Sequence, residues 1–126
     1  MARHAITSAR IAPSAGPFSA AVESEGSNLY LSGQVGQDPL TGQLVAGGVG
    51  RQTEQILRNA TAVLEASGRS LADVLRVGVF LTDIADFEAM NAVYAGFFDV
   101  PYPARTTVGV VALPLRARVE MDFVAR

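Results

Sequence analysis

The stretch DVLRVGVFLTDIADFEAMNAVYAGFF, residues 73–98, changes its hydrophobic period part-way along, and this change decides the fold class. Its first part, Val74 to Leu81, is a short apolar run rich in valine, which is typical of a buried strand. From about Asp86 the large apolar residues recur at helical spacing, and Asp83 or Asp86 can cap the helix that they predict. A strand followed by an amphipathic helix indicates an α/β protein. The expected buried face of this helix consists of Phe87, Met90, Tyr94, Phe97 and Phe98.

The sequence on either side of this stretch predicts one further helix and five further strands. Pro101 and Pro103 stop the helix that begins at about Asp86, and Gly68 ends the other helix, which begins near Gly50. The order βββαβαββ predicts an α+β sandwich, a mixed β-sheet with two helices on one face, formed by a single domain of residues 1–126. The expected strands are, in chain order, 6–11, 18–22, 29–32, 74–81, 105–111 and 116–124.

The strand at 74–81 is apolar on both of its alternating faces. Two helices can cover only one side of a sheet, so the other apolar side needs a separate cover. We therefore expect the chain to form a homo-oligomer.

Composition excludes several classes of function. The net charge of −2 and the absence of a basic run argue against nucleic-acid binding, and no apolar stretch reaches the ~20 residues of a membrane span. There is no cysteine, and His4 is the only histidine, so a thiolate nucleophile is excluded and a Ser-His-Asp triad is not expected. The acidic residues show no metal-ligand spacing, and no metal site is predicted.

A second informative stretch is PYPARTTVGV, residues 101–110, because it places Arg105 at the start of an apolar strand. Burying a guanidinium is costly unless an anion meets it. If the last two strands pair as a hairpin, Glu120 can supply that anion in an internal salt bridge. The alternative is that a ligand supplies it. Periodicity alone leaves both interpretations open.

Several stretches together resemble the reactive intermediate deaminase (Rid, YjgF-like) family over residues 6–125, nearly the whole chain. They are APSAGPFSAAV, LYLSGQVGQDPLTG, RQTEQILRNATAVLEASG, DVLRVGVFLTDIADFEAMNAVYAGFF, PYPARTTV and VEMDFVA. The resemblance implies a chorismate-mutase-like fold and a cytoplasmic homotrimer with three clefts between subunits. It also implies hydrolysis of reactive enamines and imines, such as the 2-aminoacrylate that pyridoxal-phosphate enzymes release, to 2-keto acids and ammonium.

The resemblance also implies roles for individual residues. Arg105 matches the arginine that holds the substrate carboxylate, and Glu120 matches the acid that positions or activates water. The residues implied to form the rest of the substrate pocket are Phe18, Ser32, Gly33, Phe87, Asn91 and Thr107. Two of these depart from the family: Phe18 replaces the tyrosine of a GPY motif, and Thr107 stands where cysteine is common. No cofactor is implied, because the imine carbon is already electrophilic and needs only a placed water.

Other functions stay open at this point. The same cleft can serve a non-catalytic protein that binds small carboxylates or regulates a partner, or a pathway-specific deaminase such as one acting on 2-aminomuconate. Older family names encourage a ribonuclease or translation inhibitor, against which the acidic net charge and the lack of a basic, aromatic groove weigh.

Overall fold

The strand and the helix expected in residues 73–98 are both present in the computed structural model, which describes residues 2–24 and 26–126. Strand β4 (Val74–Leu81) is followed by a 3-10 turn and by helix α2 (Phe87–Tyr94). Of the two expected caps of the helix, Asp83 caps the 3-10 turn before it instead, since its carboxylate accepts the backbone N–H of Ala85 at 2.9 Å. Asp86 makes no capping hydrogen bond.

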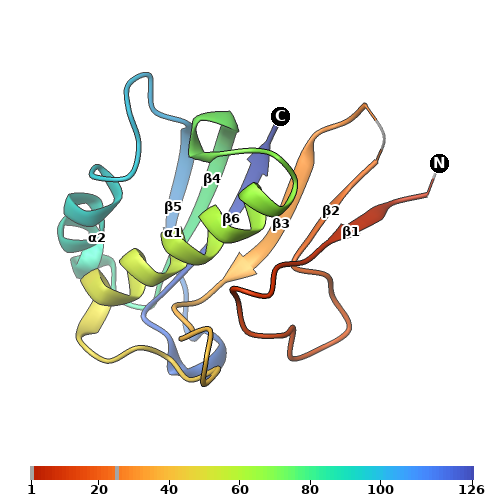
Figure 1. The fold of residues 1–126 in the computed structure, drawn as a ribbon. Coiled ribbons are helices and arrows are strands. Elements are labelled where there is room, and N and C mark those ends of the chain that lie inside the picture. Colours follow the sequence, from red (N-terminus) through yellow and green to blue (C-terminus); the bar gives the residue numbers. More distant parts are fainter. Residues whose placement is uncertain (1, 25) are drawn as a thin grey trace.

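The chain order βββαβαββ is confirmed (Figure 1). The remaining elements are β1 (His4–Ile6), β2 (Ala21–Glu23), β3 (Leu29–Gln34), α1 (Gly48–Ala66), β5 (Ala104–Gly109) and β6 (Val119–Ala125). Several bounds were wrong: α2 ends at Tyr94, before Phe97 and Phe98, β1 ends at Ile6, β2 begins after Phe18, and β6 begins at Val119. The last difference arises because residues 114–116 form a 3-10 turn in which Leu115 and Arg116 both have a φ of +58°.

All six strands form one mixed sheet in the order β1-β2-β3-β6-β4-β5. Only β4 and β5 pair in parallel, with α2 in the crossover between them, and every other neighbouring pair is antiparallel. Strand β4 therefore lies between β5 and β6. The last two strands of the chain do not form a hairpin.

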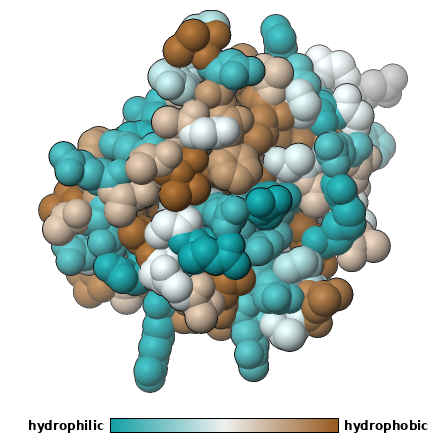
Figure 2. Space-filling model, turned by 60° about the vertical axis from the view of Figure 1, so that its left-hand side comes forward, coloured by the Kyte–Doolittle hydropathy of each residue, from teal (hydrophilic) through white to brown (hydrophobic). Residues whose placement is uncertain are grey.

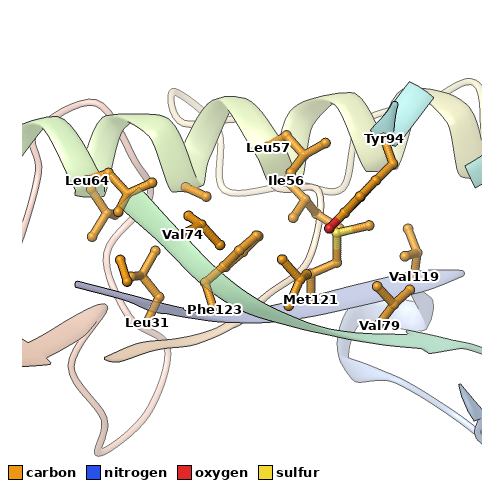
Figure 3. Close-up of a cluster of buried hydrophobic side chains, with 14 of the residues drawn as sticks. Leu31, Ile56, Leu57, Leu64, Val74, Val79, Tyr94, Val119, Met121 and Phe123 are labelled. Carbon is orange, nitrogen blue, oxygen red and sulfur yellow. The ribbon is translucent and has the colours of Figure 1, made fainter. Parts of the chain in front are cut away.

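Both helices cover the same face of the sheet, as expected, and the core lies beneath them (Figures 1 and 3). Side chains from α1, such as Ile56 and Leu64, meet Met121 and Phe123 of β6 there, and all four are buried. Gly68 ends α1 with a φ of +77°, and its N–H donates to the carbonyl of Glu65 at 3.1 Å. This packing fixes the sheet on which the candidate site is built.

The opposite face of the sheet carries no helix. Apolar side chains remain on it, including Tyr30 and Val108, which are 50% and 41% exposed. They are mixed with the charged side chains of Arg76, Glu120 and Asp122, so this face is less apolar than β4 alone suggests. Neither helix of the described ranges is long and apolar enough to cross a membrane.

Candidate active site

Arg105 stands at the start of β5 on the face that the helices cover. It is the register partner of Val77, which in turn pairs with the buried Phe123. Its guanidinium carbon lies 4.7 Å from the ring centroid of Tyr94 and 5.6 Å from that of Phe87, both on α2. Two aromatic faces of one helix thus hold the cation.

The guanidinium of Arg105 forms no ion pair with any residue of the described ranges. Seven of the ten arginines do pair with carboxylates, which makes this one an exception. Its nearest further polar contact is a donation from Nη1 to the Sδ of Met90 at 3.9 Å. Arg105 therefore keeps donors available for an anion that the described chain does not supply.

A pocket of about 270 Å³ opens beside this arginine, lined by Asn91, Tyr94, Ala95, Tyr102, Pro103 and Arg105. We call the group of Phe87, Met90, Asn91, Tyr94 and Arg105 the arginine half-site. Burial raises the pKa of Tyr94, and the neighbouring Arg105 partly offsets that rise. Figure 2 brings the α2 side forward and shows apolar surface in its upper half bordered by hydrophilic side chains.

The start of α2 is fixed to the sheet by a bidentate ion pair. Arg118, next to β6, donates to the two carboxylate oxygens of Asp86 at 2.8 and 3.1 Å. The backbone N–H of Arg118 donates to Oε1 of the buried Gln52 in α1 at 2.9 Å. These contacts join both helices to β6 and thereby set where Phe87 lies.

Glu120 lies on β6, on the face that no helix covers. It is the register partner of Phe80, whereas the core residues Val119 and Met121 point the other way. Its carboxylate packs against the Cα of Gly33, where a Cβ would overlap it. Position 33 therefore requires glycine, because the Glu120 carboxylate lies too close to leave room for a Cβ atom.

A second pocket, of about 320 Å³, surrounds this carboxylate. Residues 11–15 of the N-terminal loop line it together with Phe18, Gly33, Leu115 and Glu120. We call Phe18, Gly33, Leu115 and Glu120 the glutamate half-site. Burial raises the pKa of Glu120, and the negative charge of Asp122 raises it further. A carboxyl with a raised pKa in a mostly apolar pocket is suited to proton transfer.

The two half-sites lie on opposite faces of the sheet. Arg105 shares its face with Val77 and Phe123, while Glu120 shares the other face with Phe80. Strand β4 also separates their two strands. The internal Arg105–Glu120 salt bridge was therefore a wrong interpretation, since it needed β5 and β6 to pair as a hairpin.

Comparison with known proteins places this fold and these residues in a family. The family model described as Endoribonuclease L-PSP matches residues 7–126. A 2-iminobutanoate/2-iminopropanoate deaminase of Dermatophagoides farinae is 44% identical over 109 residues, covering 86% of this chain and 84% of that protein. The chain belongs to the reactive intermediate deaminase family.

Solved structures of the reactive intermediate deaminase family match the fold closely. The crystal structure of RidA from the Antarctic bacterium Psychrobacter sp. PAMC 21119 has a TM-score of 0.92 at 39% identity, with 97% of this chain and 98% of that chain covered. E. coli TdcF with bound serine has a TM-score of 0.91 at 35% identity, with 97% of each chain covered. The resemblance read from the sequence motifs is thus confirmed at the level of family and fold.

Within this member of the family, the eight expected site residues divide between the half-sites. Phe87, Asn91 and Arg105 gather at α2, with Thr107 on the same face of β5, while Phe18, Gly33 and Glu120 gather at the second pocket. Ser32 precedes Gly33, and its hydroxyl donates to the carbonyl of Ser19 at 2.6 Å, which gives it a structural role. Within the described residues, no acidic or histidine cluster could hold a metal ion.

Sequence reasoning missed part of the arginine half-site. Tyr94 and Met90 were assigned only to the buried face of the helix, yet both contact Arg105. Phe87 was expected to be buried and is 38% exposed, because it lies at the rim beside the guanidinium. The available signal was the spacing of residues 87, 90, 91 and 94, which places all four on one helical face.

Proposed function

We propose that this chain is a hydrolytic deaminase that converts 2-imino acids and their enamine tautomers into 2-keto acids and ammonium. The observation that carries the proposal is the half-buried guanidinium of Arg105, which is held by aromatic rings and has no carboxylate partner among the described residues. A planar bidentate donor of this kind matches the carboxylate of a 2-imino acid. The deaminase name of the Dermatophagoides farinae relative, and the serine bound by TdcF, support the same assignment.

The reaction needs one water and one acid–base group. Water adds to the imine carbon, Glu120 accepts a proton from that water, and the same proton passes to the nitrogen. The product of these steps is a carbinolamine. Glu120 then takes the proton of its hydroxyl and delivers it to the nitrogen as the carbon–nitrogen bond breaks, which forms the carbonyl of the 2-keto acid and releases ammonia. Ammonia takes up a proton from water and becomes ammonium. Glu120 suits both steps because burial and Asp122 raise the pKa of its carboxyl toward the working pH.

We infer that each site is completed between two copies of the chain in a homotrimer. Arg105 and Glu120 lie on opposite faces of the sheet, so one copy cannot present both to a small molecule. The uncovered face carries exposed Tyr30 and Val108, which a neighbouring copy would bury. Three equivalent contacts of this kind close into a ring and form three clefts.

The proposed substrate, a 2-imino acid, is a reactive product of other enzymes. We propose that pyridoxal-phosphate enzymes of the cytoplasm release it. Phe18 lines the glutamate half-site where many family members have tyrosine. The missing hydroxyl removes one hydrogen bond to the substrate, worth about 1 kcal/mol. We therefore expect lower activity on the smallest imino acids than a tyrosine at this position would give.

The family model is described as an endoribonuclease, and the charge of this chain does not favour that activity. Seven arginines pair with carboxylates, and the net charge is −2. Nucleic-acid binding requires a continuous basic surface to neutralise phosphates. The site geometry fits a small carboxylate better.

The deciding experiment couples the protein to a dehydratase that generates 2-aminoacrylate and follows the formation of keto acid and ammonium. The wild type should accelerate hydrolysis, and Arg105→Ala should lose about 2–5 kcal/mol of transition-state stabilisation. Arg58→Ala, an exposed arginine on α1, is the control and should behave as wild type. Binding of 2-ketobutyrate that depends on Arg105, without turnover of any imino acid, would instead establish a non-catalytic carboxylate-binding protein.

A further inference from the structure

Arg105 is held in an unusual way for a half-buried arginine. Ion pairing is the ordinary means of keeping such a guanidinium in place, and it is how Arg118 is kept beside Asp86. At Arg105 the contacts are instead the ring faces of Tyr94 and Phe87 and the thioether of Met90. These contacts therefore fix the position of the Arg105 guanidinium without neutralising its positive charge.

Tyr94 is the closer of the two rings and the better fixed. It is 5% exposed, its ring lies 4.7 Å from that of Phe98, and it points from α2 toward the sheet (Figure 3). Its hydroxyl is buried and has no hydrogen-bond partner among the described residues. The contact that the geometry gives Tyr94 with Arg105 is thus that of its ring face, although the guanidinium also lies near enough to the hydroxyl to lower its pKa.

We propose that Tyr94 is a positioning residue for the proposed deaminase reaction, which holds the Arg105 guanidinium by its ring face so that the N–H edge stays free for the ligand carboxylate. A ring attracts the face of a planar cation and leaves the in-plane donors unused. A carboxylate in the place of Tyr94 would occupy those donors and compete with the ligand. The inference rests on the proposed function only in taking the ligand of Arg105 to be a carboxylate.

The test compares two substitutions of Tyr94 that both keep an apolar side chain. Tyr94→Phe retains the ring and should change the Kd for 2-ketobutyrate, and the KM for the imino acid, by no more than about twofold. Tyr94→Leu removes the ring and should raise both by about tenfold, with a smaller effect on kcat. Equal losses in the two variants would overturn the proposal, since the hydroxyl would then be the important group.

A structural role of Tyr94 is separated from a positioning role in two ways. Phe98→Leu removes a buried ring that packs on Tyr94, so it should lower the thermal stability and leave the Kd for 2-ketobutyrate unchanged. In an Arg105→Ala background, Tyr94→Leu should have no further effect on that Kd, because its action passes through the arginine. A tenfold loss in Phe98→Leu, or full additivity in the double variant, would contradict the proposal.

A ligand-free measurement keeps this inference distinct from the deaminase assignment. The Nε–H proton of Arg105 should show an upfield ring-current shift and slowed exchange by NMR, both reduced in Tyr94→Leu, where only the more distant Phe87 ring remains, and kept in Tyr94→Phe. If the NMR signal behaves in this way but the protein does not turn over any imine, the deaminase function is contradicted and the positioning role of Tyr94 is supported. An Nε–H signal that is the same in wild type and Tyr94→Leu would overturn the positioning role, whatever the enzyme assay gives.

Discussion

Arg105 and Glu120 are 15 residues apart in the sequence and lie on opposite faces of the same sheet, with β4 between their strands. Each stands in its own pocket and neither contacts the other. In the proposed reaction the arginine half-site would supply a cation for a carboxylate, and the glutamate half-site would supply an acid–base group. The arrangement makes a second copy of the chain part of the proposed active site.

Mixed oligomers give a direct test of that arrangement. Arg105→Ala and Glu120→Gln should each be nearly inactive alone, because every site then lacks one of its halves. When the two variants are unfolded, mixed in equal amounts and refolded together, about a quarter of the sites combine an intact arginine with an intact glutamate. Turnover should recover to about a quarter of the wild-type value, measured against each variant refolded alone. If the oligomers are shown to contain both variants and turnover still does not recover, a site shared between copies is contradicted.

Gly33→Ala should damage the reaction while leaving the fold in place. An added methyl group would overlap the Glu120 carboxylate, which is the movable end of a side chain, so the carboxylate shifts and the backbone does not. A displacement of this kind costs up to about 100-fold in kcat. Gly42→Ala is a poor control because Gly42 has a positive φ, whereas Gly96→Ala meets only a backbone carbonyl at 3.4 Å and is suitable. Unaltered kcat in Gly33→Ala would show that the position of Glu120 is unimportant.

Phe18→Tyr should improve the enzyme on small substrates. Phe18 is 52% exposed and lines the glutamate half-site, so a hydroxyl added to its ring meets solvent or substrate and is not forced into the core. One hydrogen bond of about 1 kcal/mol corresponds to roughly a fivefold rise in kcat/KM. Steady-state assays on 2-aminoacrylate and on an imino acid with a larger apolar side chain should show the gain only for the former. A uniform gain on both would mean that the hydroxyl does not contact the space near the imine.

The order and type of the elements could be predicted from the sequence because each signal is local. The valine-rich run at 74–81, the helical spacing after Asp86 and the glycine at position 68 act over a few residues, and all three predictions were confirmed. The neighbour of each strand is not a local property. Sequential strands pair in roughly two-thirds of cases, and β5 and β6 belong to the remainder because β4 inserts between them.

The same limit applies to the site. The face on which Arg105 or Glu120 lies along its own strand follows from alternation, but their relation to each other depends on the strand order. Tyr94 was missed because a large apolar face on a helix is ordinarily core, and only the position of Arg105 beside its ring shows its second role. The family resemblance implied residue roles that periodicity did not, and these roles stay predictions.

The pH dependence of stability should report the environment of Glu120. Burial and the charge of Asp122 raise the pKa of this carboxyl, so its folded-state pKa lies above the unfolded value. Its contribution to stability is therefore complete below the unfolded-state pKa and is lost as the pH rises through the folded-state pKa. At neutral pH the ionised Glu120 is a net cost, and Glu120→Gln should raise the Tm there. The gain should vanish at a pH of about 4 or below, where both states of the wild type bind the proton.

Glu54 provides the matched control of opposite sign. The hydrogen bond from Arg58 is the main cause that lowers the pKa of its carboxyl, so its contribution is present above the unfolded-state pKa and is lost as the pH falls through the lower, folded-state value. Glu54→Gln should thus leave the Tm unchanged or slightly lower at neutral pH. In the enzyme assay, the acidic limb of kcat/KM should lie above the ordinary range of a glutamate and disappear in Glu120→Gln but not in Glu54→Gln. A Tm that falls in Glu120→Gln at neutral pH would contradict the prediction, since the ionised carboxylate would then be stabilised in the folded protein.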